Sequence, residues 1–102
     1  MFLGIDCGTQ GTKALLLDAS NGRVLGQGSA GHDLISGPNG RREQDTEQWS
    51  AAFASATAAA LAEAGVDGDA VLGIGVSGQQ HGLVTLDAAG RVLRPAKLWC
   101  DT

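Results

Sequence analysis

Short apolar runs separated by turn residues make up the first thirty positions of the chain. Residues 2–6 and 12–18 are mainly apolar segments of the length typical of buried strands. The Ser-Asn-Gly sequence at 20–22 predicts a hairpin that leads into a third strand at 23–27. We therefore expect three antiparallel strands at the start of the chain.

The middle of the chain changes from strand-like runs to helical spacing. Residues 31–42 include Gly-Pro-Asn-Gly and keep no period, which predicts a surface loop. Asp45 or Thr46 can cap a helix that ends before Gly65. Its apolar positions recur at helical spacing: Trp49, Phe53, Ala56 and Ala60. This alanine-rich face is typical of a helix that packs closely on a sheet.

The last third predicts two more strands, at 71–77 and 83–87, around a polar loop at 78–82. The helix provides a crossover to the first of them, so the sheet is expected to be mixed. The predicted class is α/β. Three strands, a helix and a returning strand resemble the ribonuclease H-like core of the actin and hexokinase superfamily.

Composition narrows the possible functions. A chain of 102 residues with 43% hydrophobic residues can bury one small core. Its net charge of −4, without a basic stripe, argues against nucleic-acid binding. No secretory signal or bilayer-spanning run occurs, so we expect a cytoplasmic protein without membrane association. Cys7 and Cys100 lack ligand-type neighbours, which predicts reduced thiols rather than a disulfide or zinc site.

The sequence DCGTQGTK at 6–13 is the first candidate site. Asp6 ends a predicted strand and could hold Mg²⁺ directly or through water, while Gly8 and Gly11 let successive backbone amides face one anion. Further donors follow from Thr9, Gln10 and Thr12. A plain hairpin turn remains an equal alternative. A Walker A loop is excluded, because the segment enters a strand and not a helix.

A G-x-G-x-x-G pattern at Gly73, Gly75 and Gly78 does not predict dinucleotide binding. The last glycine of that fingerprint must open a helix, whereas the following residues form a loop. Gly73 and Gly75 share one face of the predicted strand. We expect them to let a helix or another backbone approach closely.

Two further groups suit a polyhydroxylated ligand. Gln80 and His81, after Gln79, lie in the loop at the carboxyl end of a strand, where α/β sheets commonly bind ligands. Trp99 and Asp101 combine an aromatic face with a carboxylate. A loop without any ligand is an open alternative for both groups, and His32 has no such neighbours.

Taken together, five stretches resemble the FGGY family of carbohydrate kinases, and within it the xylulokinases: residues 6–13, 42–49, 77–82, 86–87 and 94–101. The resemblance implies that residues 1–102 are part of the amino-terminal domain of a two-domain kinase, whose second domain is absent from this truncated chain. It implies ATP, Mg²⁺ and D-xylulose as ligands, with D-xylulose 5-phosphate as product. The general base and adenine pocket would lie in the missing carboxyl-terminal domain, so this chain alone is expected to be inactive.

The resemblance also implies residue roles. Asp6 would be the catalytic and magnesium-organising carboxylate, and the phosphates of ATP would face Gly8, Thr9 and Gln10, with Thr12 as a further donor. The sugar would contact Gln80, His81, Trp99 and Asp101. Many xylulokinases carry Met at the position of Gln80.

Three alternatives follow from the same residues. One is another kinase of the family, acting on ribulose, gluconate or glycerol. The others are a non-catalytic actin-like ATP-binding module and a stand-alone binding domain. The oligomeric state is open, with a homodimer among the alternatives.

Overall fold

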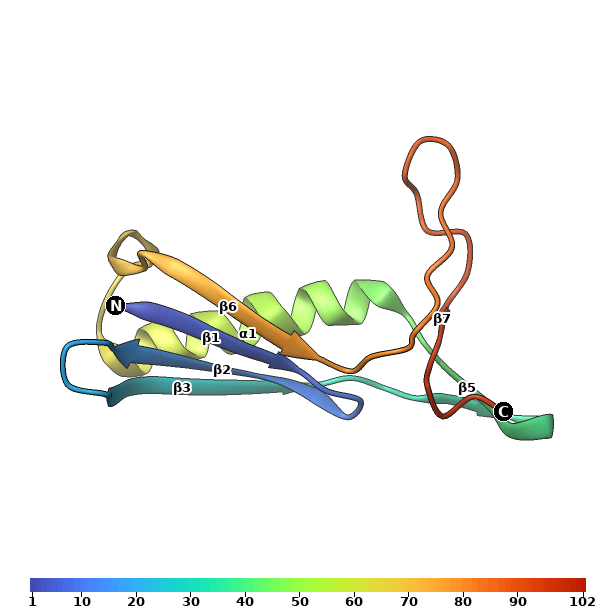
Figure 1. Ribbon diagram of the computed structural model, residues 1–102, viewed down its shortest axis with the longest axis horizontal. Helices are drawn as coiled ribbons and strands as arrows, with labels where there is room; N and C mark the ends of the chain where they lie inside the picture. The colour runs from blue at the N-terminus through green and yellow to red at the C-terminus, as the bar shows by residue number, and fades with distance from the viewer.

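A computed structural model describes all residues, 1–102, as two sheets and one long helix (Figure 1). The larger sheet has the strand order β3-β2-β1-β6 and the smaller one β4-β5-β7. Their strands are β1 (Phe2–Cys7), β2 (Gly11–Asp18), β3 (Arg23–Gly31), β4 (Ile35–Gly37), β5 (Arg41–Gln44), β6 (Gly73–Gly78) and β7 (Ala96–Lys97). The helices are α1 (Thr46–Ala64) and the short 3₁₀ turns η1 (Pro38–Gly40) and η2 (Gly68–Ala70).

The larger sheet confirms the predicted meander and crossover. β1 pairs antiparallel with β2, and β2 pairs antiparallel with β3. After α1 the chain returns as β6, which pairs parallel with the other edge of β1. Since β1 and β6 run in the same direction, their carboxyl ends meet at one edge of the sheet.

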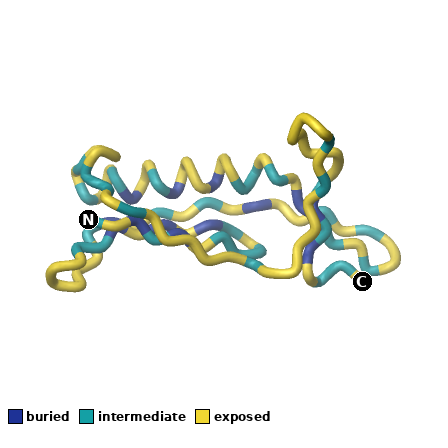
Figure 2. The backbone as a smooth tube through the Cα atoms, turned by 45° about the horizontal axis from the view of Figure 1, so that its top comes forward, coloured by how far each residue is buried: buried dark blue, intermediate teal, exposed yellow.

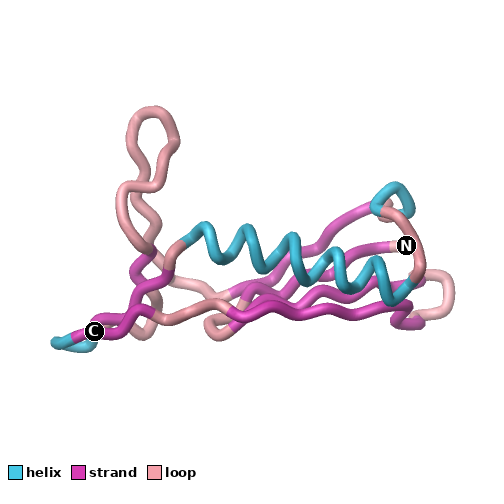
Figure 3. Tube along the Cα trace, turned by 180° about the vertical axis from the view of Figure 1, so that it is seen from behind, coloured by secondary structure: helices cyan, strands magenta, loops and turns pink.

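Helix α1 begins and ends where the sequence predicts. The Asp45 side chain accepts a hydrogen bond from the Glu47 N–H at 2.9 Å, and Gly65 closes the helix with a left-handed φ of 70°. The buried positions of the helix are alanines: Ala52, Ala56 and Ala60. Figure 3 shows α1 running along one face of the sheet. No helix of the structure has the length and apolar character needed to cross a membrane.

Glycines of β3 allow the close helix packing. A Cβ atom on Gly28 would lie 2.1 Å from the carbonyl oxygen of Ala56, and one on Gly26 would lie 2.2 Å from that of Ala60. The sequence prediction of a close helix or backbone at Gly73 and Gly75 is wrong: a Cβ on Gly75 would meet nothing within 4 Å, and one on Gly73 would meet only the Phe2 side chain, at 3.2 Å. The physical reason is that α1 lies over β2 and β3 and leaves β6 uncovered.

Two other expectations are corrected. Residues 31–42, predicted as a loop, contain β4, η1 and the first residues of β5. Residues 83–87, predicted as a strand, make only the isolated bridges Leu83–Lys97 and Leu86–Val92. With no partner strand along their length they form an exposed arm that projects away from both sheets (Figure 1).

The apolar core lies between the larger sheet and α1 (Figure 2). It consists of Leu3, Ile5, Ala14, Leu16, Ala56 and Ala60. Buried polar side chains lie outside this cluster, and two of them, Glu43 and Gln44, are fully buried at the end of β5. The end of the sheet where β1 and β6 stop therefore meets a polar interior.

Candidate active site

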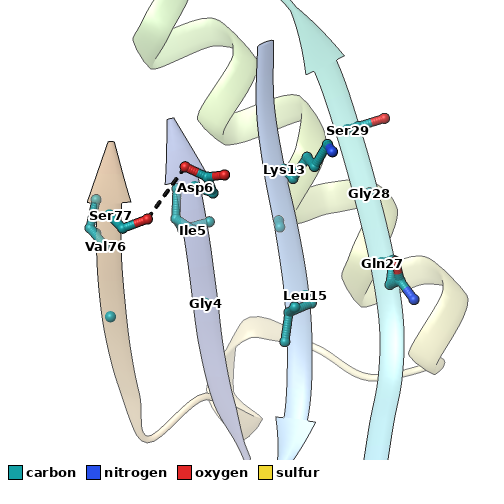
Figure 4. A pocket seen from close by; sticks show the side chains of 12 residues that line it. Gly4, Ile5, Asp6, Lys13, Leu15, Gln27, Gly28, Ser29, Val76 and Ser77 are labelled. Carbon is teal, nitrogen blue, oxygen red and sulfur yellow. Dashed lines mark hydrogen bonds between the residues drawn. The ribbon is translucent and has the colours of Figure 1, made fainter. Parts of the chain in front are cut away.

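The site lies at the shared carboxyl end of β1 and β6. Figure 4 shows Asp6 of β1 beside Ser77 of β6, on the sheet face that α1 does not cover. The two residues are paired in register, and the Ser77 hydroxyl donates to Asp6 Oδ1 at 3.3 Å. This open sheet face forms a hollow of about 850 Å³. Asp6 thus presents an exposed carboxylate at the mouth of the turn that follows it.

The turn after β1 has free backbone donors. The Gly8 N–H closes it by donating to the Gly11 carbonyl at 2.9 Å, whereas the N–H groups of Thr9 and Gln10 make no hydrogen bond within the chain. Phosphate oxygens are suitable acceptors for such paired amides. An open cavity of about 610 Å³ adjoins the turn, lined by Asp6, Gly8, Thr9, Gln10, Gly11, Thr12, Lys13, Ser29, Ala30, Gly31 and Trp99.

A second cavity, of about 440 Å³, adjoins the loop after β6. Gln80 and His81 are exposed there, and His81 has a left-handed φ of 60°, which a non-glycine residue adopts infrequently. The cavity is lined by Asp6, Gly8, Thr9, Gly78, Gln79, Gln80, His81 and Trp99. Half of these residues also line the cavity of about 610 Å³ beside the turn, which we call the first cavity. The predicted phosphate turn and sugar loop therefore open onto neighbouring spaces.

Polar side chains connect the two cavities. Thr9 Oγ1 donates to Gln79 Oε1 at 3.1 Å and accepts from the indole N–H of Trp99 at 3.0 Å. The buried Gln44 donates from Nε2 to the Thr9 carbonyl, while its Oε1 accepts from Trp49 Nε1 at 2.8 Å and from Gln79 Nε2 at 3.0 Å. These five residues form one connected network, which we call the amide network.

Thr12 lies at the base of the turn with its side chain buried. Its hydroxyl is 2.7 Å from His32 Nε2, and the residue is only 1% exposed. Ala14 and Leu16, two and four residues further along β2, face the same side, toward α1. Thr12 therefore supports the turn from the helix side of the sheet, and His32 is its partner.

Asp101 is the one predicted site residue that lines neither cavity. Its Oδ2 accepts from the Arg42 backbone N–H at 3.0 Å and lies 3.5 Å from Lys97 Nζ. The Arg42 N–H, with a smaller contribution from Lys97, holds the pKa of the Asp101 carboxyl below its ordinary value. Its predicted contact with the sugar is untested and stays a prediction.

The site fits a magnesium ion bound mainly by substrate. No group of three or more His, Cys, Asp or Glu side chains could enclose a metal. Mg²⁺ characteristically keeps several waters and binds through one or two carboxylates plus substrate phosphates. Asp6, a single carboxylate at the edge of the first cavity, matches that donor set.

The buried side chains behind the site do not stand out in the sequence. From the sequence, Gln44 belongs only to the stretch 42–49, Trp49 to the apolar face of a helix, and Ser77 to a strand. The available signal was the polar pair Glu43-Gln44 directly before the Asp45 cap. Pattern alone does not reveal that both are buried.

Comparison with known proteins gave consistent matches. Residues 1–102 match the model of the "FGGY family of carbohydrate kinases, N-terminal domain". The chain is 53% identical to a "Xylulose kinase" of Haemophilus influenzae over 106 residues, covering 100% of this chain and 22% of the relative. It is 46% identical to a "Xylulose kinase" of Streptomyces coelicolor over 101 residues, covering 99% and 20%.

A solved structure agrees in fold. The crystal structure of a "xyloylose kinase from Brucella ovis" superposes with a TM-score of 0.91 at 44% identity, over 99% of this chain and 21% of that protein. The sheet and helix thus match the amino-terminal part of actin/hexokinase-like kinases, as expected from the order of elements. The chain spans about a fifth of the length of each of these three proteins.

Proposed function

Because this chain belongs to the FGGY family of carbohydrate kinases, we propose that the full-length protein transfers the γ-phosphoryl group of ATP to D-xylulose, giving D-xylulose 5-phosphate. The observation that carries the proposal is the junction of the two cavities, which share Asp6, Gly8, Thr9 and Trp99. A phosphoryl donor and an acceptor must lie side by side for in-line transfer. The relatives named xylulose kinase favour this sugar.

In this proposal the turn after β1 binds the phosphates of ATP. The unpaired N–H groups of Thr9 and Gln10 donate to phosphate oxygens, and Gly8 leaves room for their approach. Asp6 would hold Mg²⁺ or its water shell, and the ion, when bound, would neutralise negative charge on the phosphates. Asp6 is accordingly the catalytic residue that we assign within this chain.

The second cavity receives the sugar. Gln80 and His81 offer neutral donors and acceptors to its hydroxyl groups, and the exposed ring of Trp99 offers an apolar face. We place the general base, which accepts the proton of the attacking hydroxyl, in the remainder of the full-length protein. We also propose a cytoplasmic location, where ATP is available.

The test is ATP-dependent phosphorylation of D-xylulose by the full-length protein, with D-ribulose, D-gluconate and glycerol as control acceptors. Selective turnover of xylulose supports the proposal. We expect Asp6→Ala to lower kcat/KM by on the order of 100-fold or more, since an electrostatic contact to the transferring group is lost. Turnover of a control acceptor alone would transfer the assignment to another kinase of the family. Absence of any turnover would refute the kinase function.

A further inference from the structure

Gln44 is fully buried and lines none of the cavities at the site, so it has no direct access to a substrate. We infer that Gln44 is a positioning residue, which holds the phosphate turn and the sugar loop in one fixed relation. The inference rests on the proposed function, because it gives these two segments their ligands. Gln44 itself contacts neither the phosphates nor the sugar in that proposal.

The contacts of Gln44 use both ends of its amide. Nε2 donates to the backbone carbonyl of Thr9, at the tip of the phosphate turn. Oε1 accepts from Gln79 Nε2, next to the sugar-loop residue Gln80, and from the Trp49 indole N–H. Only Asn and Gln carry a neutral donor and acceptor on one such group, and Asn is shorter by one methylene.

The segments that meet at Gln44 are far apart in the sequence. Trp49 belongs to the first turns of α1, whose later residues pack into the core of the larger sheet. Thr9 also bonds Trp99, which extends the network to the carboxyl end of the chain. Gln44 therefore connects both the turn and the loop of the site to the packed helix.

Loss of the Gln44 contacts should lower kcat more than it weakens the binding of either substrate. Each loop keeps its own ligand contacts, whereas the distance between donor and acceptor is no longer fixed. A displacement of about 1 Å can cost on the order of 100-fold in rate. We expect substitution of Gln44 to lower kcat by roughly 10- to 100-fold and to change the KM for ATP and for xylulose by less than about 3-fold.

The experiment compares Gln44→Met and Gln44→Glu with the matched control Gln48→Met in the full-length protein. Gln48 is also an amide near the start of α1, but it accepts only from the Asp33 N–H, at 2.7 Å, and lies outside the network. We expect kcat to fall in both Gln44 variants and to stay unchanged in the control. Unchanged kcat in the Gln44 variants would overturn the inference.

Gln44→Glu adds a rescue that a merely structural role would not give. An ionised carboxylate cannot donate to the Thr9 carbonyl, whereas a protonated carboxyl can. The kcat of Gln44→Glu relative to wild type should therefore rise as the pH is lowered, and that of Gln44→Met should not. A constant ratio in both variants would contradict the inference.

A spectroscopic readout separates this inference from the kinase proposal. With 5-fluorotryptophan in the full-length protein and the Trp99 signal assigned through Trp99→Phe, Gln44→Met should shift the fluorine resonance of Trp99, which bonds Thr9 and not Gln44. Gln48→Met should leave it in place. If wild type lacks kinase activity but the shift occurs, the proposed function fails and the positioning role stands. An unshifted resonance overturns the positioning role whatever the activity.

Discussion

The two sheets of this chain are stabilised by different interactions. The sheet body, defined as β1, β2, β3, β6 and α1, encloses an apolar core of leucine, isoleucine and alanine. The small sheet, β4, β5 and β7, encloses no such cluster, and its buried side chains include Glu43 and Gln44. Apolar burial therefore stabilises the scaffold, while directional polar contacts position the segments around the site.

Glu43 is the centre of the small sheet. Its fully buried carboxylate accepts from Arg41 Nε on the same strand and from Nη2 of Arg94, which lies between residues 83–87 and β7. The hydrogen bond from Arg41, with help from Arg94, holds the pKa of Glu43 below its ordinary value, although burial opposes this. The ion pairs thereby connect a distant segment of the chain to β5.

The largest expected effect breaks the core of the sheet body. Leu16 is fully buried, so Leu16→Ala should lower the free energy of unfolding by about 2–5 kcal/mol. The measurement is hydrogen exchange of β1–β3 amides in the full-length protein. Leu15→Ala is the control, because Leu15 is 38% exposed on the opposite face of the same strand. Equal losses for the two variants would contradict the assignment of the core.

A smaller effect is expected from filling the helix–sheet contact. Gly28→Ala places a methyl group against the backbone of α1 and should cost about 1–3 kcal/mol. Gly75→Ala, also in the interior of a strand, meets nothing within 4 Å and should be nearly neutral. Denaturant unfolding followed by exchange of α1 amides distinguishes them. Comparable stability of both variants would show that α1 does not rest on Gly28.

The next effect concerns the connection between the two regions. Asp45 joins β5 to α1, and Asp45→Ala removes its bond to the Glu47 N–H, which should cost about 1 kcal/mol. Asp67 occupies the corresponding position of η2 but makes no capping bond, so Asp67→Ala should leave stability unchanged. Exchange rates in the first turn of α1 provide the measurement. Their invariance in Asp45→Ala would refute the capping role.

The smallest effect on global stability is expected from the small sheet itself. Glu43→Gln removes the charge that pairs with Arg41 and Arg94, so residues 83–97 should exchange faster while the sheet body is unaffected. Glu63→Gln, an exposed residue without an ion pair in the structure, is the control. Faster exchange in the sheet body as well would contradict the separation of the two regions.

The ion pairs of Glu43 also make the stability of the small sheet depend on pH. Because the folded-state pKa of Glu43 lies below the unfolded value, its contribution is fully present above the ordinary carboxyl range, near pH 4, and is lost as the pH falls through the lower folded-state value. Acid should therefore open residues 83–97 in wild type before the sheet body. Glu43→Gln should show less of this acid dependence, and an identical profile would contradict it.

The sheet body was predictable because apolar period and turn chemistry agree there. The strands of the meander and the limits of α1 at Asp45 and Gly65 followed from local sequence. β4 and β5 were missed because they are three and four residues long and β5 has the polar sequence RREQ. The expectation for 83–87 failed because a short strand-like sequence does not guarantee a partner strand.

For the candidate site, most residues named from the sequence line the two cavities, and their binding roles stay predictions, whereas the side chains that support them were not predicted. Asp6, the turn and the polar loop lie at the ends of strands, and the sequence pattern predicts those strand ends. The position of Asp101 depends on the backbone of Arg42, and the burial of Gln44 depends on three segments meeting, so neither is encoded locally. Contacts of this kind become visible only in three dimensions.

The glycines of β3 also fix the position of α1 along the sheet. Gly26 and Gly28 are about 6.8 Å apart along the strand, and Ala56 and Ala60 are about 6 Å apart along the helix, so the two spacings nearly match. A helix held at two such points cannot slide without colliding with a neighbouring strand residue. Trp49 lies two helical turns before Ala56, so its position relative to the sheet is fixed as well. The absence of side chains at Gly26 and Gly28 thereby sets the distance from the core to the site.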